Sequence, residues 1–410
     1  MSKFRKDPGV RLCSAVALFY LSAFLLLYLK DFNTMGLILA GAVPAMIWLG
    51  TILLPHLFPS DRLLLSLTNF LCALGVLVLY ATNPAYARDQ AVSYGVGLVA
   101  MIVCVWAVRL IRSWRGLAPL LAAACLGLLA LPLAFGTETN GALNWISVGG
   151  FSMQPSEFVK LGLVIVLSWY MSRHSFLPWV VFSVCCLGLL MLQKDLGTAL
   201  IYYGTALLLY FASSGSWTVT GLGVLGGAGA AVAGYVMFAH VKKRVAIWLN
   251  PWSDYRNAGY QVVQGLIALA SGGVWGCGLG LGNPTRIPVY ETDFIFTVIC
   301  EQFGLIFGLC VLAMYVALIW RGATTAMAAR YSFHGLLAMG CTLIIGLQTF
   351  TIIGGVIKLI PLTGVTLPFV SRGGSSLVTS MCLMGFVQGV YSLNADHLKE
   401  DMALAEGDAV

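Results

Sequence analysis

Charged residues are scarce in this sequence. They make up only 10% of the chain, whereas hydrophobic residues make up 59%. Soluble domains carry about a quarter charged residues and just under half apolar ones. No polar segment is long enough to bury a soluble core of its own. The composition therefore excludes an ordinary soluble enzyme and indicates one polytopic membrane domain without a separate extramembrane domain.

The sequence also lacks the motifs of several common enzyme classes. It contains no HExxH, no GxSxG and no GxxxxGK[ST]. The stretch "GCGLGLGNP" repeats glycine, but no strand precedes it, so it does not predict a dinucleotide site. The 5 histidines are unpaired along the chain, which argues against a metal cage of histidines. A divalent cation, Mg²⁺ or Mn²⁺, shared between a carboxylate and a ligand phosphate stays open as an optional cofactor.

Paired cysteines and a basic nucleic-acid face are missing as well. The 11 cysteines lie almost all inside apolar runs, with Cys277 as the clearest exception, and no CxxC pair occurs. Buried free thiols are therefore expected, and disulfides or a zinc site are not. The net charge of +7 is scattered over short loops without interleaved aromatics, so it does not predict nucleic-acid binding.

Long apolar runs are what the sequence does contain. A membrane-spanning helix needs about 20 mainly apolar residues. The runs lie near 11–30, 36–55, 64–82, 94–112, 117–135, 157–172, 177–193, 196–213, 217–240, 293–320, 335–357 and 375–394. Backbone groups inside a bilayer must be paired, so these runs predict an all-α bundle of about 12 transmembrane helices. The first run follows a basic start without a small-residue cleavage site, and we interpret it as a signal anchor.

The positions of lysine and arginine predict the orientation of these spans. Basic residues gather at the N-terminus and in two short loops: Lys3, Arg5, Lys6, Arg11, Arg109, Arg112, Arg115, Arg321 and Arg330. With about 12 spans all three regions fall on one side, which the positive-inside rule assigns to the cytoplasm. Both termini are then cytoplasmic, and the loops 136–156, 241–292 and 358–374 face outward. We expect the acidic end "KEDMALAEGDAV" to be a disordered cytoplasmic tail.

The loop 241–292 is unusual for its length and charge. Most connections are short, whereas this one runs for about 50 residues. It is rich in Gly, Trp and Tyr, and its basic residues are Lys242, Lys243, Arg244, Arg256 and Arg286. A basic loop on the outer face suggests a site for an anionic ligand at the membrane surface, although a solvated connector is the alternative.

Acidic residues follow this loop at the entry to the next span, in "VYETDFIFTVICEQFG". If the helix starts at Asp293, then Thr297 and Glu301 lie on the same face. Asp293 could simply cap the helix. Glu301 would lie about 12 Å deeper at 1.5 Å rise per residue, where no capping role explains it. Buried charges of this kind usually face a cavity and serve function.

Other polar groups stand at the predicted outer ends of the spans. Glu157 and Lys160 follow Pro155 at a predicted helix start, after an amphipathic aromatic segment typical of the membrane interface. Lys194 and Asp195 separate two short apolar runs. The stretch "SRGGSS" could offer backbone N–H groups to an anion, or form a simple turn. The expected ligand is anionic, lipid-linked and bound at the outer leaflet.

Several of these stretches together resemble a known family. The segments "NGA..W…QPSE..K", "Q.DLGTAL", "GYQ..Q…GG..G.GLG", "TDFIF..I.E..G" and "P.TG..LPF.S.GGSS" occur in this order. They are similar to the RodA/FtsW/SpoVE family, also called SEDS proteins. The resemblance covers residues 64–394 and implies a ten-helix core. Residues 1–63 would then add two N-terminal transmembrane helices, and 395–410 a cytoplasmic acidic tail.

The resemblance implies a function and a set of site residues. Family members polymerise lipid II as peptidoglycan glycosyltransferases at the outer face of the bacterial inner membrane, with a class B penicillin-binding protein as partner. It implies Asp293 as the catalytic residue. The expected substrate-binding residues are Trp145, Gln154, Glu157, Lys160, Asp195, Arg286, Glu301, Arg372 and Ser375. It leaves open whether the chain serves elongation, division or sporulation.

The chain departs from the family pattern at several positions. Asn144 stands at a usual Arg, Lys194 at a usual Pro, Glu291 at a usual His, Gln302 at a usual Glu, Ile352 at a usual Asn, Lys358 at a usual Gly and Arg372 at a usual Tyr. One hypothesis is that pyrophosphate contacts have moved, with Arg372 and Lys194 supplying the charge that Asn144 lacks.

We expect a single inverting displacement with Asp293 as general base, which needs no second carboxylate about 5 Å away. Lys160, Arg286 and Arg372 are the expected stabilisers of the leaving group. The alternative function is a flippase or transporter for a lipid-linked precursor, which buried ionisable residues would also fit. A third interpretation is a structural protein that recruits a division enzyme.

Overall fold

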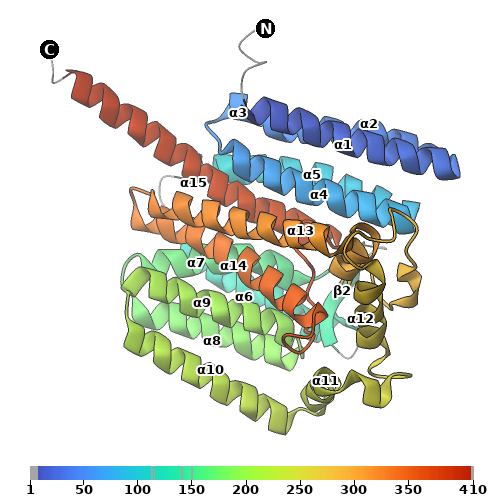
Figure 1. The fold of residues 1–410 in the computed structure, drawn as a ribbon. Helices are drawn as coiled ribbons and strands as arrows, with labels where there is room; N and C mark the ends of the chain where they lie inside the picture. The colour runs from blue at the N-terminus through green and yellow to red at the C-terminus, as the bar shows by residue number, and fades with distance from the viewer. Residues whose placement is uncertain (1–7, 112–113, 115, 140–141, 149–150, 408–410) are drawn as a thin grey trace.

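The computed structural model describes residues 8–111, 114, 116–139, 142–148 and 151–407. It is a bundle of long helices that run roughly side by side (Figure 1). The helices of the first half are α1 (Pro8–Asp31), α2 (Thr34–Trp48), α3 (Leu54–Leu57), α4 (Arg62–Thr82), α5 (Pro84–Leu110), α6 (Leu117–Phe135), α7 (Pro155–Met171) and α8 (Phe176–Leu192). Those of the second half are α9 (Leu196–Ser214), α10 (Trp217–Met237), α11 (Ala239–Leu249), α12 (Tyr260–Gly272), α13 (Ile295–Met327), α14 (Ser332–Val356) and α15 (Gly374–Gly407).

A helix covers most of each of the 12 apolar runs, which confirms an all-α polytopic membrane protein. Ten helices of the described part are long and apolar enough to cross a membrane. The other two predicted spans, α7 and α8, have 17 residues each. At 1.5 Å per residue each is about 26 Å long, slightly short of a hydrocarbon core of about 30 Å. Both helices pack against α6 and α9. Helix α7 is mostly buried there, whereas α8 keeps one side exposed.

The most deeply buried spans are α4 and α15. In each, 83% of the most apolar window is inside the protein, compared with 28% for α1. The hairpin α1–α2 packs against α4 and α5 on one flank of the bundle (Figure 1). A π-helical turn, Leu49–Leu53, brings Thr51 to Asn69, and Tyr94 donates to the same amide. These buried hydrogen bonds tie the two N-terminal helices to the rest of the bundle.

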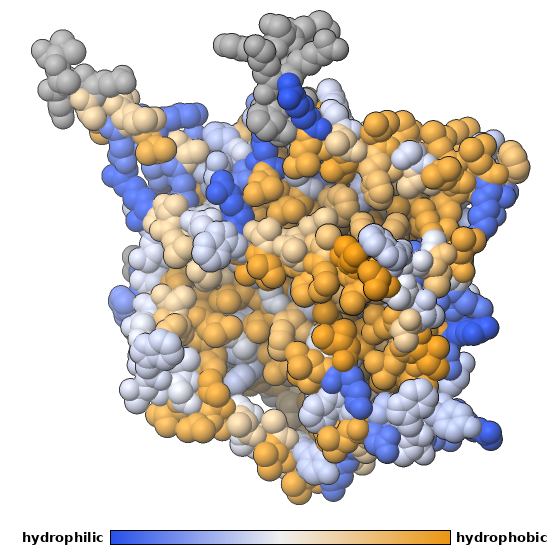
Figure 2. Space-filling view, in the orientation of Figure 1, coloured by the Kyte–Doolittle hydropathy of each residue, from blue (hydrophilic) through white to orange (hydrophobic). Residues whose placement is uncertain are grey.

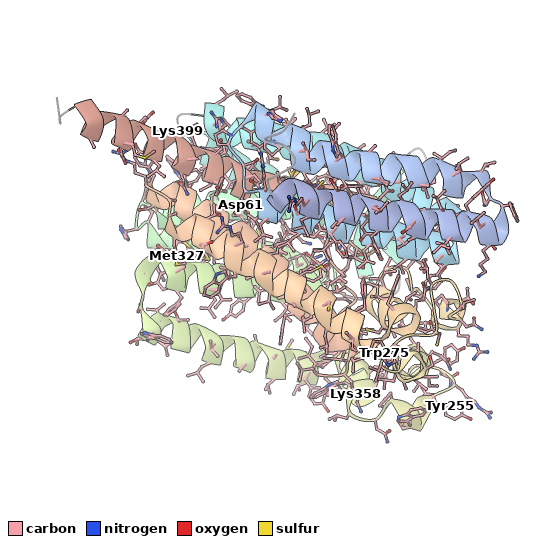
Figure 3. The ribbon with its side chains drawn as sticks, turned by 45° about the horizontal axis from the view of Figure 1, so that its top comes forward. Asp61, Tyr255, Trp275, Met327, Lys358 and Lys399 are labelled. Atoms are coloured by element: carbon pink, nitrogen blue, oxygen red, sulfur yellow. The ribbon has the colours of Figure 1, made fainter. Side chains whose placement is uncertain are left out.

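The two ends of the bundle differ in structure. The start of α1 and the end of α15 lie at one end, which we call the terminal end, together with Asp61, Met327 and Lys399 (Figures 1 and 3). At the other end, the loop end, lie α11, α12 and Lys358 (Figures 1 and 3). Hydrophobic side chains cover the middle of the visible face, and hydrophilic ones gather toward the two ends (Figure 2). The loops 241–292 and 358–374, which were predicted to face the same side, therefore both lie at the loop end.

The terminal end carries several of the arginines that predicted a cytoplasmic side. Arg321 pairs with the buried Asp61, and Arg109 pairs with Asp396 at 3.0 Å. Five basic residues of that prediction lie outside the described residues: Lys3, Arg5, Lys6, Arg112 and Arg115. The acidic tail is not disordered over its described part, because α15 continues to Gly407. Arg330 meets Asp401 there at 3.3 Å.

Two segments at the loop end differ from the sequence prediction. The long connection after α10 is structured, because it contains α11, α12 and two 3-10 turns, Pro251–Asp254 and Pro284–Arg286. The segment before α7 is a small antiparallel sheet rather than a simple interfacial stretch. Its strands β1 (Thr137–Thr139), β2 (Ala142–Val148) and β3 (Phe151–Met153) pair in that order.

Helix α13 is broken at Gly304, which has φ 87° and ψ 171°. The chain around residue 275 fills the break. Cys277 N–H donates to the Glu301 carbonyl, and Leu305 N–H donates to the Gly273 carbonyl, at 2.8 and 3.0 Å. Irregular backbone below the start of a span is tolerated only where protein or a wet cavity surrounds it. The break therefore fixes the segment after α12 against α13.

Candidate functional site

The loop end encloses a cavity of about 620 Å³. Its walls come from β2, the starts of α7 and α9, α11, α12, the chain just before α13, and the segment between α14 and α15. The lining side chains that can ionise are Glu157, Lys194, Asp195, Arg244, Asp293 and Lys358. A second hollow of about 300 Å³ lies at the terminal end, but no Asp or Glu lines it. Carboxylates and cations thus meet in the first cavity, which is the candidate site.

Asp293 lies at the cavity wall, just ahead of α13. The helix begins at Ile295, so the prediction that it starts at Asp293 is wrong by two residues, and Asp293 is not its cap. The Asp293 N–H donates to the Val289 carbonyl at 3.3 Å, which closes a turn. Gly364 faces the carboxylate, since a Cβ added there would lie 3.5 Å from Oδ2. A side chain at 364 would narrow the space in front of Asp293.

The surroundings of Asp293 favour proton acceptance near neutral pH. Burial raises the pKa of Asp293 to about 6, and Glu291 also raises it, whereas a hydrogen bond from Thr292 and the charge of Arg244 lower it. The side chain is only partly exposed, and that exposure is toward the cavity it lines. A carboxylate with a pKa close to the operating pH is suited to general base catalysis.

Glu157 and Lys160 form a buried ion pair beside the cavity. Lys160 Nζ lies 2.8 Å from Glu157 Oε1 and donates to Gln348 Oε1 at 2.9 Å. Thr379 Oγ1 donates to the other carboxylate oxygen at 3.1 Å. The pair joins α7 to α14 and α15. Glu157 lines the cavity, whereas Lys160 lies behind it and is 2% exposed.

Asp195 caps α9 and organises the neighbouring strand. Its carboxylate accepts from Thr198 N–H, and its Oδ2 also accepts from Asn144 Nδ2 and Gln154 Nε2 at 3.0 and 2.9 Å. Trp145, Gln154 and Asp195 all line the cavity, as the resemblance implied for a common site. Because its oxygens are already bonded, Asp195 is suited to holding β2 and α7 in place.

The sequence did not predict that three particular cations would line the cavity together. Arg244 from α11, Lys194 from the α8–α9 turn and Lys358 from the end of α14 all face the cavity. Arg244 NH1 donates to the Thr363 carbonyl at 3.1 Å. In the sequence, Lys194 and Lys358 stood out as expected departures from the family pattern. Arg244 stood out only as a basic residue of the loop 241–292. No spacing rule links them, because they are far apart along the chain.

Glu301 lies away from the candidate cavity. It is 6% exposed, and its Oε1 accepts from the Asn283 N–H at 3.0 Å. The other oxygen, Oε2, has no partner among the described residues, and a Cβ on Gly282 would lie 2.8 Å from it. The three acidic residues of this stretch, Glu291, Asp293 and Glu301, therefore do not share one site. Glu291 acts on Asp293, while Glu301 holds the loop that fills the break in α13.

Arg372 does not line the cavity either. Its guanidinium stacks 3.7 Å from the Tyr86 ring centre and lies 3.7 Å from Glu291 Oε1 and 3.9 Å from Asp89 Oδ2. The Arg372 N–H donates to the Glu291 carbonyl at 2.8 Å. The hypothesis that Arg372 replaces a phosphate contact is therefore not supported by its position. Arg372 instead fixes the turn that carries Asp293.

This position leads to a test by charge exchange. Arg372→Glu is expected to lower kcat about tenfold with little change in KM, because small displacements of a reacting group are costly. Adding Glu291→Arg should restore kcat to within about threefold of the wild type. Steady-state kinetics with lipid II, the substrate that the resemblance implies, measure both parameters. A raised KM that the second substitution does not restore would indicate a substrate contact instead.

Arg286 and Ser375 are the last two residues expected in the site. Arg286 ends the 3-10 turn before α13 and is exposed outside the lining. Ser375 lies in the first turn of α15, also outside it. Its neighbour Ser376 makes the closer connection, with its Oγ 2.6 Å from Thr366 Oγ1 at the cavity wall.

A metal ion would need help from a ligand in this cavity. Among the described residues, no group of three or more His, Cys, Asp or Glu side chains could hold one. Carboxylates such as Asp293 suit Mg²⁺ or Mn²⁺, provided that phosphate oxygens of a bound ligand complete the coordination.

Comparisons with a family model and with individual proteins point to the same family. The family described as "Cell cycle protein", with FtsW, RodA and SpoVE in its name, matches residues 62–395. The chain is 33% identical to stage V sporulation protein E of Bacillus subtilis over 80% of this chain and 96% of that protein. It is 39% identical to the peptidoglycan glycosyltransferase RodA of Mycobacterium bovis over 63% of this chain and 59% of that protein.

A solved structure shares the fold. The chain resembles a protein from a study of how a peptidoglycan synthase complex coordinates polymerization and crosslinking. The TM-score is 0.69 at 28% identity, over 82% of this chain and 98% of that one. The helices α1 and α2 precede the matched family region.

Proposed function

This chain belongs to the FtsW, RodA and SpoVE family of cell cycle proteins, and from that premise we propose that it polymerises lipid II into glycan strands. As a member of this family it is a multi-pass membrane protein and a peptidoglycan glycosyltransferase. The proposed site is the cavity at the loop end, facing outward from the bacterial inner membrane, with both termini in the cytoplasm. Arginines at the terminal end, such as Arg109 and Arg321, support this orientation.

One observation carries the proposal. A partly buried carboxylate, Asp293, shares a cavity with cationic side chains at one end of a membrane bundle. A base and an anion-binding surface are what an inverting sugar transfer from a lipid diphosphate needs. The transfer changes an α linkage into a β linkage in one displacement, so a single general base suffices.

In the proposed step, Asp293 accepts the proton of the GlcNAc 4-hydroxyl of one lipid II molecule. The 4-oxygen attacks the anomeric carbon of the growing chain as the bond between that carbon and the diphosphate oxygen breaks. The diphosphate leaves with the bonding electrons on its polyprenyl carrier. Asp293 then releases the proton to water. General base catalysis of this type contributes roughly 10²–10⁴-fold.

The position of α10 supports entry of a lipid-linked substrate. This helix has no buried residue and packs mainly on α9 (Figure 1). It leads directly into α11, which supplies Arg244 to the cavity. A polyprenyl chain could therefore stay in the hydrocarbon beside α10 while its polar head reaches the cavity, without dragging the apolar tail through water.

The raised pKa of Asp293 gives a pH dependence with a definite sign. Only the deprotonated carboxylate accepts a proton, so kcat/KM should fall about tenfold per pH unit below pH ~6 and level off above it. Arg244 lowers the pKa of Asp293, so Arg244→Gln should move the acidic limb to higher pH. Polymerisation rates between pH 5 and 8 measure this. A flat profile over that range would rule out Asp293 as the titrating base.

We also propose a class B penicillin-binding protein as the partner that crosslinks the product. The solved relative described above comes from work on a complex that couples polymerization to crosslinking, which supports this choice. A divalent cation remains an optional part of the site, where it would help to neutralise the leaving diphosphate.

A second candidate function is transport of a lipid-linked precursor across the membrane. The observation that favours it is the break in α13 at Gly304, since discontinuous helices are common in transporters. The segment around residue 275 fills this break, and its freed backbone groups are hydrogen-bonded to protein. The break therefore has a structural explanation that requires no transport.

A further inference from the structure

Three cations line the cavity without a carboxylate partner. Lys194, Arg244 and Lys358 contribute to the wall. Within the described part of the chain, none of them has an Asp or Glu oxygen within 4.0 Å. The neighbouring carboxylates of Glu157 and Asp195 are already bonded to Lys160, amides and hydroxyls. The three cations therefore line the cavity without a direct ion pair, and Arg244 acts on the nearby Asp293 only through its charge.

Two of these cations sit on strained backbone. Lys194 has φ 61° and Lys358 has φ 63°, in the left-handed region that favours glycine. A side chain there has a steric cost that glycine avoids. Strained non-glycine residues tend to occur at ligand sites, where surrounding structure holds them. Lys358 therefore carries a side chain at a position where glycine would fit more easily.

The surrounding contacts hold the cations near one another. Lys358 Nζ donates to the Leu249 carbonyl at 3.3 Å, and Trp248 Nε1 donates to the Lys358 carbonyl at 3.1 Å. These bonds join the end of α14 to α11, which carries Arg244. Burial lowers the pKa of His240 in α11, and the charges of Arg244 and Lys194 lower it further. Both cations therefore act on the same region of α11.

We propose that Lys194, Arg244 and Lys358 form the binding site for the diphosphate of a polyprenyl diphosphate. This inference rests on the proposed function, because that diphosphate is the leaving group. As the bond from the anomeric carbon to the diphosphate oxygen breaks, the electron pair stays on the diphosphate and its negative charge grows. Cations fixed at that position stabilise the growing charge. Lys194, Arg244 and Lys358 thus supply this charge, and Arg372, which lies outside the lining, does not.

Equilibrium binding of undecaprenyl diphosphate tests this site directly. The measurement uses the full-length protein in detergent with Asp293→Asn in the background, so that no turnover interferes. We expect Lys194→Gln and Lys358→Gly each to weaken binding about tenfold, and the double variant about 100-fold, as for lost hydrogen bonds to charged groups. Undecaprenol, which lacks phosphate, should bind all variants equally.

The controls separate this site from general effects. Lys242→Gln removes the same charge from the exposed surface of α11, outside the lining, and should change affinity less than about twofold. Lys358→Gly relieves the left-handed strain, so it should unfold at a temperature no lower than that of the parent protein. Unchanged affinity for undecaprenyl diphosphate in both single variants would overturn the proposal, as would equal weakening of undecaprenol. Polymerisation that survives Asp293→Asn would instead contradict the base assignment and leave the binding result standing.

Discussion

Asp293→Asn is expected to reduce the rate of glycan polymerisation by about 10²–10⁴-fold, the usual contribution of a general base. The amide keeps the shape of the side chain but cannot accept the hydroxyl proton. Because burial raises the pKa of Asp293 to about 6, its ionised form destabilises the fold above that pH. The variant should therefore be at least as stable as the wild type at neutral pH. Gel analysis of strands made from labelled lipid II, with a thermal unfolding curve, measures both properties.

Asp254→Asn provides a matched control for this substitution. Asp254 is exposed at the same end of the bundle, in the 3-10 turn after α11, and outside the lining. Its carboxylate accepts from Asn257 and Ala258 in its own turn. Loss of this charge should leave polymerisation within about twofold, since exposed ion interactions contribute little. Equal loss of activity in both variants would mean that surface charge, and not proton transfer, determines the rate.

The second large effect concerns stability. Lys160→Met should lower the free energy of unfolding by about 3–5 kcal/mol, because it leaves the buried Glu157 carboxylate without its cation. The side chains of this pair are only 3% and 8% exposed, so water replaces the lost partner poorly. Gln348 would lose a hydrogen bond as well. Thermal unfolding in detergent, compared with the wild type, measures the loss.

A double variant identifies the cause of that destabilisation. Glu157→Gln with Lys160→Met removes both charges and keeps a group that can accept from Thr379. Replacing a buried ion pair by neutral groups is often nearly neutral, so most of the stability should return. Activity need not recover with stability, because Glu157 lines the candidate cavity. A double variant as unstable as the single one would indicate that Lys160 stabilises the fold by packing and not by charge.

The helices of this protein follow from the sequence, but their exact ends do not. Apolar runs such as 64–82 must be helical in a bilayer, and α4 covers that run. The start of α13 differs from the prediction, because Asp293 belongs to a turn closed on the Val289 carbonyl. Residues 399–407 were expected to be disordered, but they are helical. Tertiary ion pairs such as Arg330–Asp401, which no local pattern reveals, accompany the extension of α15.

The site was only partly predictable for a similar reason. Motifs located Trp145, Asp195 and Asp293, and all three line one cavity. Lys358 and Arg244 were visible only as isolated charges, because the contacts that bring them together join segments more than 100 residues apart. Arg372 and its partner Glu291 are also far apart in sequence, so their contact could not be predicted from either stretch. The contact between Glu291 and Arg372 joins the turn before α13 to the segment before α15.

The most direct test of the central claim is polymerisation in detergent, where no membrane leaflets exist. The purified full-length protein, with and without a cognate class B penicillin-binding protein, would be given labelled lipid II in micelles. The account predicts a ladder of glycan strands that disappears with Asp293→Asn. Absence of strands under all these conditions, together with movement of lipid II across sealed vesicles that persists in Asp293→Asn, would contradict it and identify a transporter.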